Sequence, residues 1–205
     1  MTVTAGHQQT KLSDELELWL AGDGEKTVGT LIDTFGDKSF AILFVLLLGV
    51  PALPLPTGGA THVFEVIAAL LAAQLVAGRH QVWLPQRWRR LGLAGDTQQK
   101  FIASLMKLIR RLERISRPRL RFLFHRRFTD VLFGLAVLGG TAGAFFAPPF
   151  TGLDTLPALG VLILSLGVLL EDFAIVIAGT ALGIAGMVLE IVLGAAAIHG
   201  LRTLL

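Results

Sequence analysis

The sequence contains no cysteine and little charge. Without cysteine the chain can form neither a disulfide bond nor a thiolate metal site, and cysteine usage gives no information about its redox compartment. Charged residues make up 16% of its 205 residues, against about a quarter of an average soluble domain. The apolar residues, 53% of the chain, stand in blocks instead of being spread at the period of a helix or a strand. Such blocks are typical of membrane segments.

A secretory leader and common enzyme motifs are also missing. The first residues, MTVTAGHQQTKLSDELELWLAG, have no basic stretch before an apolar core, so we expect internal segments to direct membrane insertion. H-E-x-x-H, G-x-S-x-G and P-loop motifs are absent, and the five histidines lack the spacing of metal ligands. Ser165 in LILSLGVLL has no base nearby in sequence, which favours a packing role. The sequence therefore predicts no metal, no cofactor and no catalytic residue, and gives an enzyme no support.

The charges are divided unevenly along the chain. Residues 1–38 carry seven acids and three bases, whereas residues 79–127 carry fourteen Lys and Arg against two acids. A basic block can bind nucleic acid, but lipid-like segments flank this one, and the positive-inside rule explains it better. We therefore expect residues 79–127 to lie in the cytoplasm and to bind no nucleic acid.

A Pro- and Gly-rich stretch, VPALPLPTGGATH, separates two apolar runs at residues 39–53 and 60–77. Each run is shorter than the roughly 20 residues of a perpendicular span. Residues 39–78 therefore predict a helical hairpin, which either spans the membrane thinly or enters and returns as a re-entrant pair. The residues of its tip are Pro54, Pro56, Thr57, Gly58 and Gly59.

A second hairpin is predicted at residues 128–172, where two apolar runs flank another Pro-rich stretch. Its tip contains Pro148, Pro149, Thr151, Gly152 and Asp154. The stretch Pro56-Thr57-Gly58 corresponds to Phe150-Thr151-Gly152, which favours an internal repeat, although two convergent hairpins would look alike. Many transporters contain inverted repeats. Here the basic segment joins the end of one hairpin to the start of the next, which predicts parallel repeats that both enter from the cytoplasm.

Three further segments complete the chain. Residues 1–38 predict two short amphipathic helices, the first with Ser13 as its N-cap. Residues 98–121 contain a basic amphipathic helix that either binds an anionic lipid leaflet or packs on the protein's own cytoplasmic side. Residues 173–205 contain a C-terminal transmembrane helix. In it, Gly179 and Gly183 have the spacing of a close helix contact, which is compatible with a homodimer.

Two carboxyl groups lie within apolar segments. Glu65 follows His62 by three residues, which places both on one helix face, and Glu190 interrupts the last apolar run. A carboxyl in lipid normally faces a cavity or a partner, so these three residues are candidates for coupling to a proton or a cation. Alternatively, the two carboxyls lie near the interface, where Glu65 would cap backbone amides freed at the tip.

Other charges lie at the ends of the hairpin arms. Arg79 follows the first hairpin, and Glu171 and Asp172 end the second, so Arg79 is a candidate ion-pair partner of either acid. All three residues are equally explained as ordinary interfacial charges. Asp154 precedes an apolar run and is expected to be the N-cap of the helix that follows.

The order of these segments resembles the ExoD family of bacterial membrane proteins. The resemblance covers about residues 13 to 200 and is carried by the Pro-rich first tip, by Gln74 and Gly78-Arg79 after it, and by Trp83-Leu84-Pro85. The second tip, APPFTGLD, departs from the first. The resemblance implies a bacterial inner-membrane protein linked to exopolysaccharide synthesis, and it supplies no catalytic residue.

The sequence thus predicts an all-α polytopic membrane protein with five segments, at residues 1–38, 39–78, 79–127, 128–172 and 173–205. Two functions stay open. One is a small transporter or a translocator of a lipid-linked substrate, with broken helices around Glu65 and Glu190. The other is a non-transporting accessory subunit that anchors or regulates polysaccharide-synthesis proteins.

Overall fold

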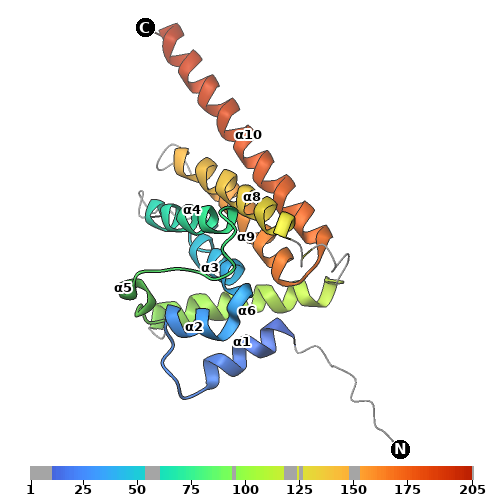
Figure 1. The fold of residues 1–205 in the computed structure, drawn as a ribbon. Coiled ribbons are helices and arrows are strands. Elements are labelled where there is room, and N and C mark those ends of the chain that lie inside the picture. The colour runs from blue at the N-terminus through green and yellow to red at the C-terminus, as the bar shows by residue number, and fades with distance from the viewer. Residues whose placement is uncertain are drawn as a thin grey trace, which may run out of the picture.

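The helices of this protein form two groups. A computed structural model describes residues 11–53, 61–93, 96–117, 124, 127–147 and 153–204. The bundle consists of α3 (Ser39–Leu48), α4 (His62–Val76), α8 (Arg127–Phe146), α9 (Thr155–Leu169) and α10 (Phe173–Leu204). The peripheral layer consists of α1 (Leu12–Ala21), α2 (Val28–Phe35), α5 (Gln86–Arg89) and α6 (Asp96–Ile115). The layer lies across one end of the bundle, and the last turns of α10 extend beyond the other end (Figure 1).

The helix α3 lies at the centre of the bundle. Eight of its ten residues are buried, as expected for a helix that is apolar on all sides. Phe44 is fully buried, and its ring meets the ring of Phe133 on α8 edge to face at 5.6 Å between centroids. Around this core α4 packs on α8, α3 packs on α9, and α9 packs on α10. The all-α prediction is confirmed for the part of the chain that the structure describes.

Within the described part of the chain, two helices are long and apolar enough to cross a membrane, Arg127–Phe146 and Phe173–Ala196. They also expose large apolar side chains on the outside of the bundle, among them Phe128, Leu132, Ile184 and Ile191. An exposed apolar surface of this kind suits contact with lipid. The arms α4 and α9 have 15 residues each, or about 22 Å of helix, which agrees with the short arms predicted from the sequence.

The hairpins and their repeat stay predictions, because both tips fall largely outside the described residues. The tip residues concerned are Pro54, Pro56, Thr57, Gly58, Gly59, Pro148, Pro149, Thr151 and Gly152. Asp154, the last residue assigned to the second tip, lies within the described part of the chain.

Glycines bring α9 and α10 into backbone contact. A Cβ atom on Gly160 would overlap the backbone of Gly183, and one on Gly179 would overlap the backbone of Leu164. The predicted close contact of Gly179 and Gly183 therefore forms within one chain. Since α9 occupies this face of α10, the face is not free for a second copy, and a homodimer stays a prediction without this support.

The glycine contact predicts unequal effects of two matched substitutions. A Cβ on Gly179 meets the backbone of Leu164, whereas a Cβ on Gly183 finds its nearest neighbour at 3.8 Å, an ordinary contact. We expect Gly179→Ala to reduce stability by about 1–3 kcal/mol through overpacking, and Gly183→Ala to have little effect. Thermal unfolding of the two variants in detergent measures the difference. Equal unfolding temperatures would contradict the described register of α9 and α10.

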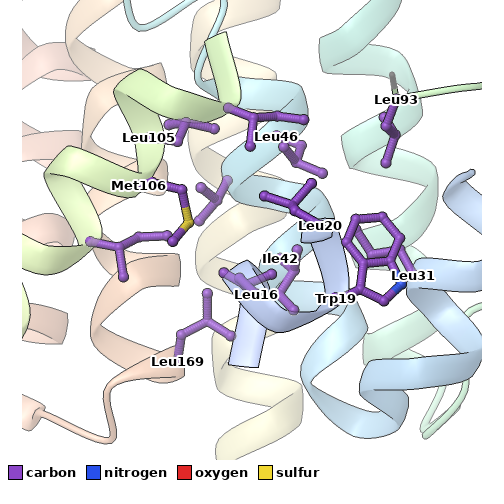
Figure 2. A pocket seen from close by; sticks show the side chains of 13 residues that line it. Leu16, Trp19, Leu20, Leu31, Ile42, Leu46, Leu93, Leu105, Met106 and Leu169 are labelled. Carbon is purple, nitrogen blue, oxygen red and sulfur yellow. The ribbon is translucent and has the colours of Figure 1, made fainter. Parts of the chain in front are cut away.

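The apolar stripe of α6 packs on the protein itself. Leu105, Met106 and Ile109 are buried in the same core as Leu16 and Ile42. Figure 2 shows Leu16, Ile42, Leu105 and Met106 around a cavity between α1, α3 and α6. The volume of this cavity is about 40 Å³. Two positions were predicted for this helix, on a lipid leaflet or against the protein itself, and the structure has α6 against the protein. Binding of residues 98–121 to an anionic leaflet stays a prediction, and only the exposed basic side chains are available for it.

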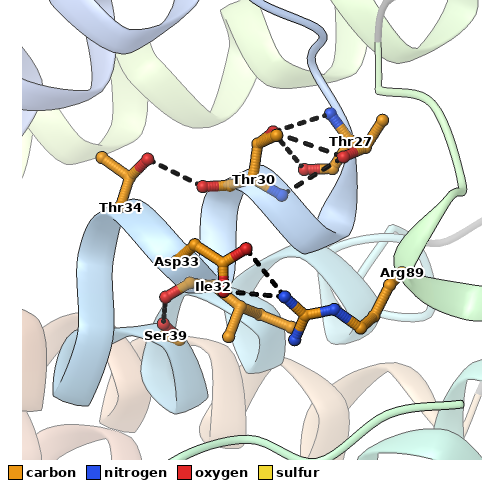
Figure 3. A network of polar contacts seen from close by, with 7 residues as sticks. All are labelled: Thr27, Thr30, Ile32, Asp33, Thr34, Ser39 and Arg89. Atoms are coloured by element: carbon orange, nitrogen blue, oxygen red, sulfur yellow. Dashed lines mark hydrogen bonds and ion pairs between the residues drawn. The ribbon is translucent and has the colours of Figure 1, made fainter. Parts of the chain in front are cut away.

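Opposite charges pair across the peripheral layer. Arg110 on α6 pairs with Glu17 on α1. Arg89 on α5 donates to both carboxylate oxygens of Asp33 on α2, each at 2.7 Å, as Figure 3 shows. The acidic first segment and the basic middle segment therefore partly neutralise each other. The sequence interpretation treated these two segments separately and missed this pairing.

Ser13 has a different role from the one predicted. The helix α1 begins at Leu12 after Lys11, without a side-chain cap. Ser13 is buried, and its backbone N–H and hydroxyl donate to the two carboxylate oxygens of Glu113 on α6, at 2.9 and 2.6 Å. The predicted N-cap is therefore wrong, because the serine joins two helices that are a hundred residues apart in sequence.

Removing the acceptor of Ser13 should loosen the peripheral layer. We expect Glu113→Ala to destabilise the protein by about 1–3 kcal/mol, because a buried donor loses its partner. Glu25→Ala, which removes an exposed carboxylate, serves as the control. Thermal unfolding and limited proteolysis between α1 and α2 measure both variants. If they match, the contact between Ser13 and Glu113 does not anchor α1.

Candidate functional site

Glu65 is a buried carboxyl on the first turn of α4. The residue is 1% exposed, and Nδ1 of His62 lies 2.6 Å from its Oε2 atom. Its other oxygen, Oε1, is buried and has no hydrogen-bond partner among the described residues. The predicted pairing of the two residues on one helix face is therefore present. A buried oxygen without a donor is unfavourable by about 1–3 kcal/mol, so this atom calls for a functional explanation.

The imidazole of His62 continues the site toward α8. Its ring centroid lies 5.1 Å from that of Phe145, near the end of α8. The His62 side chain is 30% exposed, whereas that of Glu65 is fully buried. The histidine therefore lies between the buried carboxyl and the surface, where it can relay a proton between them.

Glu190 reaches the same end of the bundle from α10. One turn before it, Gly186 packs so closely on the start of α9 that a Cβ atom there would lie 2.8 Å from atoms of Leu156 and Pro157. Oε1 of Glu190 is also buried without a hydrogen-bond partner in the described part of the chain. Both carboxyls singled out in the sequence therefore hold a buried, unpaired oxygen.

Asp154 joins these two residues in one electrostatic cluster. Its charge acts on both Glu65 and Glu190, and the charge of Glu65 acts on Glu190. Asp154 occupies the N-cap position of α9, but its side chain makes no capping hydrogen bond. The predicted N-cap position is therefore confirmed, whereas the side chain does not cap the helix. We call Glu65, His62, Asp154 and Glu190 the carboxylate cluster.

The carboxylate cluster can hold and exchange protons and can attract cations. Its four side chains come from the starts of α4 and α9 and from the middle of α10. Among the residues that the structure describes, no group of three His, Asp or Glu side chains is arranged to hold a metal ion. The helix starts of the two predicted hairpin arms, α4 and α9, thus contribute to one site together with α10.

Asp172 at the opposite end of the bundle has a structural role. Its Oδ1 accepts from the backbone N–H of Ala174 in the first turn of α10, at 3.0 Å. Its Oδ2 accepts from the backbone N–H of Arg117, just after α6, at 2.8 Å. This buried side chain caps α10 and ties it to the peripheral layer. An Asp directly before the FAIVIAG run was the signal that could have identified this cap.

The predicted ion pair of Arg79 with Glu171 or Asp172 is not among the described salt bridges. Both oxygens of Asp172 accept backbone N–H groups, and Arg79 is exposed. Glu171 has an interaction within the protein. The alternative of ordinary interfacial charges does not fit Asp172 either, since it is 3% exposed.

The arms α4 and α9 end in the same way. After α4, Gly78 has φ +81°, and the N–H of Arg79 donates to the carbonyl of Gln74 at 3.0 Å. After α9, Glu171 has φ +52°, and the N–H of Asp172 donates to the carbonyl of Gly167 at 2.9 Å. Each is a C-terminal motif closed by a residue in the left-handed region. A glutamate in that position was not predicted.

The Gln74 side chain explains part of the motif after the first hairpin. Its amide accepts from the backbone N–H of Trp83 at 2.9 Å and donates to the carbonyl of Trp83 at 3.1 Å. The pair holds the segment after α4 against the end of that helix. Among the residues that carried the family resemblance, Gln74 and Trp83 therefore close a turn at the end of α4, away from the carboxylate cluster at its start.

Comparisons with known proteins agree with the resemblance seen in the sequence. A family model described as "Exopolysaccharide synthesis, ExoD" matches residues 12–192. Protein ExoD of Rhizobium meliloti is 30% identical over 171 residues, which cover 80% of this chain and 70% of that protein. An uncharacterized protein of Synechocystis sp. is 33% identical over 127 residues, and the match spans 62% of this chain and 59% of that relative. No solved structure matches the chain.

Proposed function

This chain belongs to the ExoD family, and we propose that it is an inner-membrane protein of exopolysaccharide production that translocates a substrate with the help of the carboxylate cluster. Glu65 carries the proposal. It is a nearly inaccessible carboxyl, and one of its oxygens has no hydrogen-bond partner among the described residues. It lies within electrostatic range of Asp154 beside α9 and of Glu190 on α10. Carboxyls buried among membrane helices commonly mark ion or proton pathways.

The position of the cluster supports this function. The part of α10 from Phe173 to Glu190 is about 26 Å long, measured from the end next to the peripheral layer. The apolar span continues to Ala196. With a hydrocarbon core of about 30 Å, this length is compatible with a cluster inside the membrane, in the half away from the peripheral layer. Helix breaks at such a depth are tolerated where they line a protein site or an aqueous cavity.

Two observations support a parallel repeat of hairpins 39–78 and 128–172. The arms α4 and α9 have the same length and the same C-terminal motif. In such a repeat α3 would correspond to α8, and α4 to α9. A shared axis would then pair α4 with α8 and α3 with α9, and both pairs pack together in the structure. The basic residues of α6 favour a cytoplasmic position of the peripheral layer. With residues 1–38, 79–127 and 173–205, this gives the five-segment organisation that we propose.

One observation favours the accessory function as a second candidate. A surface groove of about 440 Å³ lies between α1 and α6, and Lys26, Lys107 and Arg110 line it beside apolar residues, Arg110 being paired with Glu17 in the same lining. Such a groove suits an acidic segment of a cytoplasmic partner, for example another protein of polysaccharide synthesis. In this case the membrane bundle is an anchor, and the carboxylate cluster has no transport role.

Neutral substitutions in the cluster test the transport function. We expect Glu65→Gln and Glu190→Gln to reduce proton flux to background in reconstituted liposomes, measured with a trapped pH-sensitive dye. Each change removes a carboxyl that would bind and release the proton, while it keeps the size of the side chain. Glu25→Gln, on the exposed surface, should transport normally. Thermal unfolding should show that the cluster variants are folded, because a neutral amide is easier to bury than a carboxylate.

Two results would contradict the transport function. One is unchanged flux in Glu65→Gln. The other is an absence of flux for protons, monovalent cations and lipid-linked sugars in the parent protein, together with co-purification of a polysaccharide-synthesis enzyme. The second result would favour the accessory function.

Cysteine labelling tests the parallel repeat. Because the chain has no cysteine, the single variants Thr57→Cys and Gly152→Cys can each be labelled at one site only. We expect a membrane-impermeant maleimide to react with both from the periplasmic side of oriented vesicles, or with neither if the tips are closed to water. Labelling of the two positions from opposite sides would contradict parallel hairpins.

A further inference from the structure

A second polar site lies at the other end of the bundle. A pocket of about 410 Å³ is formed by the 3₁₀ turn η1 (Gly36–Lys38) together with the start of α3, the end of α4, the start of α8 and the end of α9. We call it the basal pocket. Leu75, which lines it, is ten residues after Glu65 on α4, or about 15 Å along the helix. The basal pocket is therefore separate from the carboxylate cluster.

The lining of the basal pocket mixes both signs of charge around an apolar floor. Phe40, Leu75 and Phe133 contribute to the floor. The polar residues of its wall are Asp37, Lys38, His80, Arg127, Asp130 and Glu171. Opposite charges stand next to each other on α8, where Asp130 follows Arg127 by one helical turn, whereas the ammonium group of Lys38 pairs with Glu15 on α1 at 3.1 Å.

This arrangement favours a ligand rich in hydroxyl groups over an ion. A simple anion or cation near such a wall meets repulsion as well as attraction. A hydroxyl group both donates and accepts hydrogen bonds, so neighbouring hydroxyls can use alternating cationic and carboxylate side chains. Asp130 and Glu171 each have an interaction within the protein, and a carboxylate has about four acceptor positions, which leaves capacity for a ligand.

The backbone at Glu171 is a second, independent observation. Its φ of +52° lies in the left-handed region, which is unfavourable by roughly 1–2 kcal/mol for a residue with a side chain. The corresponding residue after α4 is Gly78, the residue type that normally closes such a motif. A glycine at 171 would remove the strain. The chain has instead a carboxylate that lines the basal pocket, and strain of this kind clusters at binding sites.

Gly78 serves the same pocket by lacking a side chain. A Cβ atom at Gly78 would collide with the guanidinium group of Arg127. The glycine thus lets Arg127 lie over the backbone at the end of α4, in the wall of the basal pocket. The two left-handed positions at the ends of α4 and α9 therefore both shape this site, one by a missing side chain and the other by a strained one.

We propose that the basal pocket binds an uncharged glycosyl unit, either free or as the headgroup of a membrane amphiphile. Its volume lies within the roughly 300–1,000 Å³ of small-molecule sites. The apolar floor suits the C–H face of a sugar ring, and the mixed wall suits its hydroxyls. The inference goes beyond the proposed function, because binding here requires no flux through the carboxylate cluster.

Binding to the full chain in phosphatidylcholine nanodiscs tests this proposal. The probes are monoglucosyl diacylglycerol, diacylglycerol, phosphatidylglycerol and methyl glucoside, with retention of lipids measured by native mass spectrometry and of the free sugar by equilibrium dialysis. We expect glucosyl lipid to bind at least about tenfold more tightly than diacylglycerol, because charge-assisted hydrogen bonds to hydroxyls are gained. If methyl glucoside also binds, the sugar alone is sufficient as a ligand and the lipid part is not required.

Matched variants locate the binding site. Arg127→Gln and Glu171→Gln should each weaken glucosyl lipid binding by roughly tenfold. Arg111→Gln, an exposed charge outside the pocket, should not change it. Glu65→Gln should bind glucosyl lipid as the parent protein does, so the binding result can be interpreted even if the proposed transport function is disproved.

Glu171→Gly separates binding from folding. It relieves the left-handed strain, so we expect an unfolding temperature equal to or above that of the parent protein, together with loss of glucosyl lipid binding. Three results would overturn the proposal: equal binding of diacylglycerol and glucosyl lipid, tighter binding of phosphatidylglycerol, or full binding by Glu171→Gly.

Discussion

The backbone contact between α9 and α10 sets the register on which both ends of the bundle depend. Glycines on each helix let the backbones touch at Gly160 and Gly183, and Gly186 continues the contact to the start of α9. Because α10 cannot slide against α9 without steric overlap, Glu190 is held within electrostatic range of Asp154. At the other end of α10, the carboxylate of Asp172 caps the helix and accepts a hydrogen bond from the backbone N–H of Arg117. Packing and function therefore share one set of small residues.

The peripheral layer fixes the other side of the bundle by charge and by apolar packing together. The stripe of α6 is buried against α1 and α3, while ion pairs of Glu17 with Arg110 and of Asp33 with Arg89 lie on the exposed side. Exposed pairs contribute little to stability on their own. The buried contact of Ser13 with Glu113 and the apolar stripe therefore provide most of the attachment, and the exposed pairs select which segments meet.

The sequence predicts the helices well where the signal is local. Apolar blocks were sufficient to identify α4, α8 and α10, and the spacing of His62 and Glu65 predicts the contact that the structure contains. The role of Glu65 and Glu190 stays a prediction. Prediction from the sequence fails where a side chain has a partner far along the chain. Ser13 and Asp154 both have the composition of an N-cap, yet Ser13 binds Glu113 and Asp154 makes no capping bond. Asp172, taken for an ion-pair residue, is the cap.

The two polar sites lie on opposite sides of a closed aromatic core, and this arrangement bears on how they can be connected. Phe40 and Phe133 line the basal pocket, and Phe44 packs against both rings while being fully buried. Close-packed interiors are bistable and do not deform continuously. A substrate that passed from the basal pocket toward Glu65 would therefore require a discrete rearrangement of the core around Phe44, while the glycine contact holds α9 to α10.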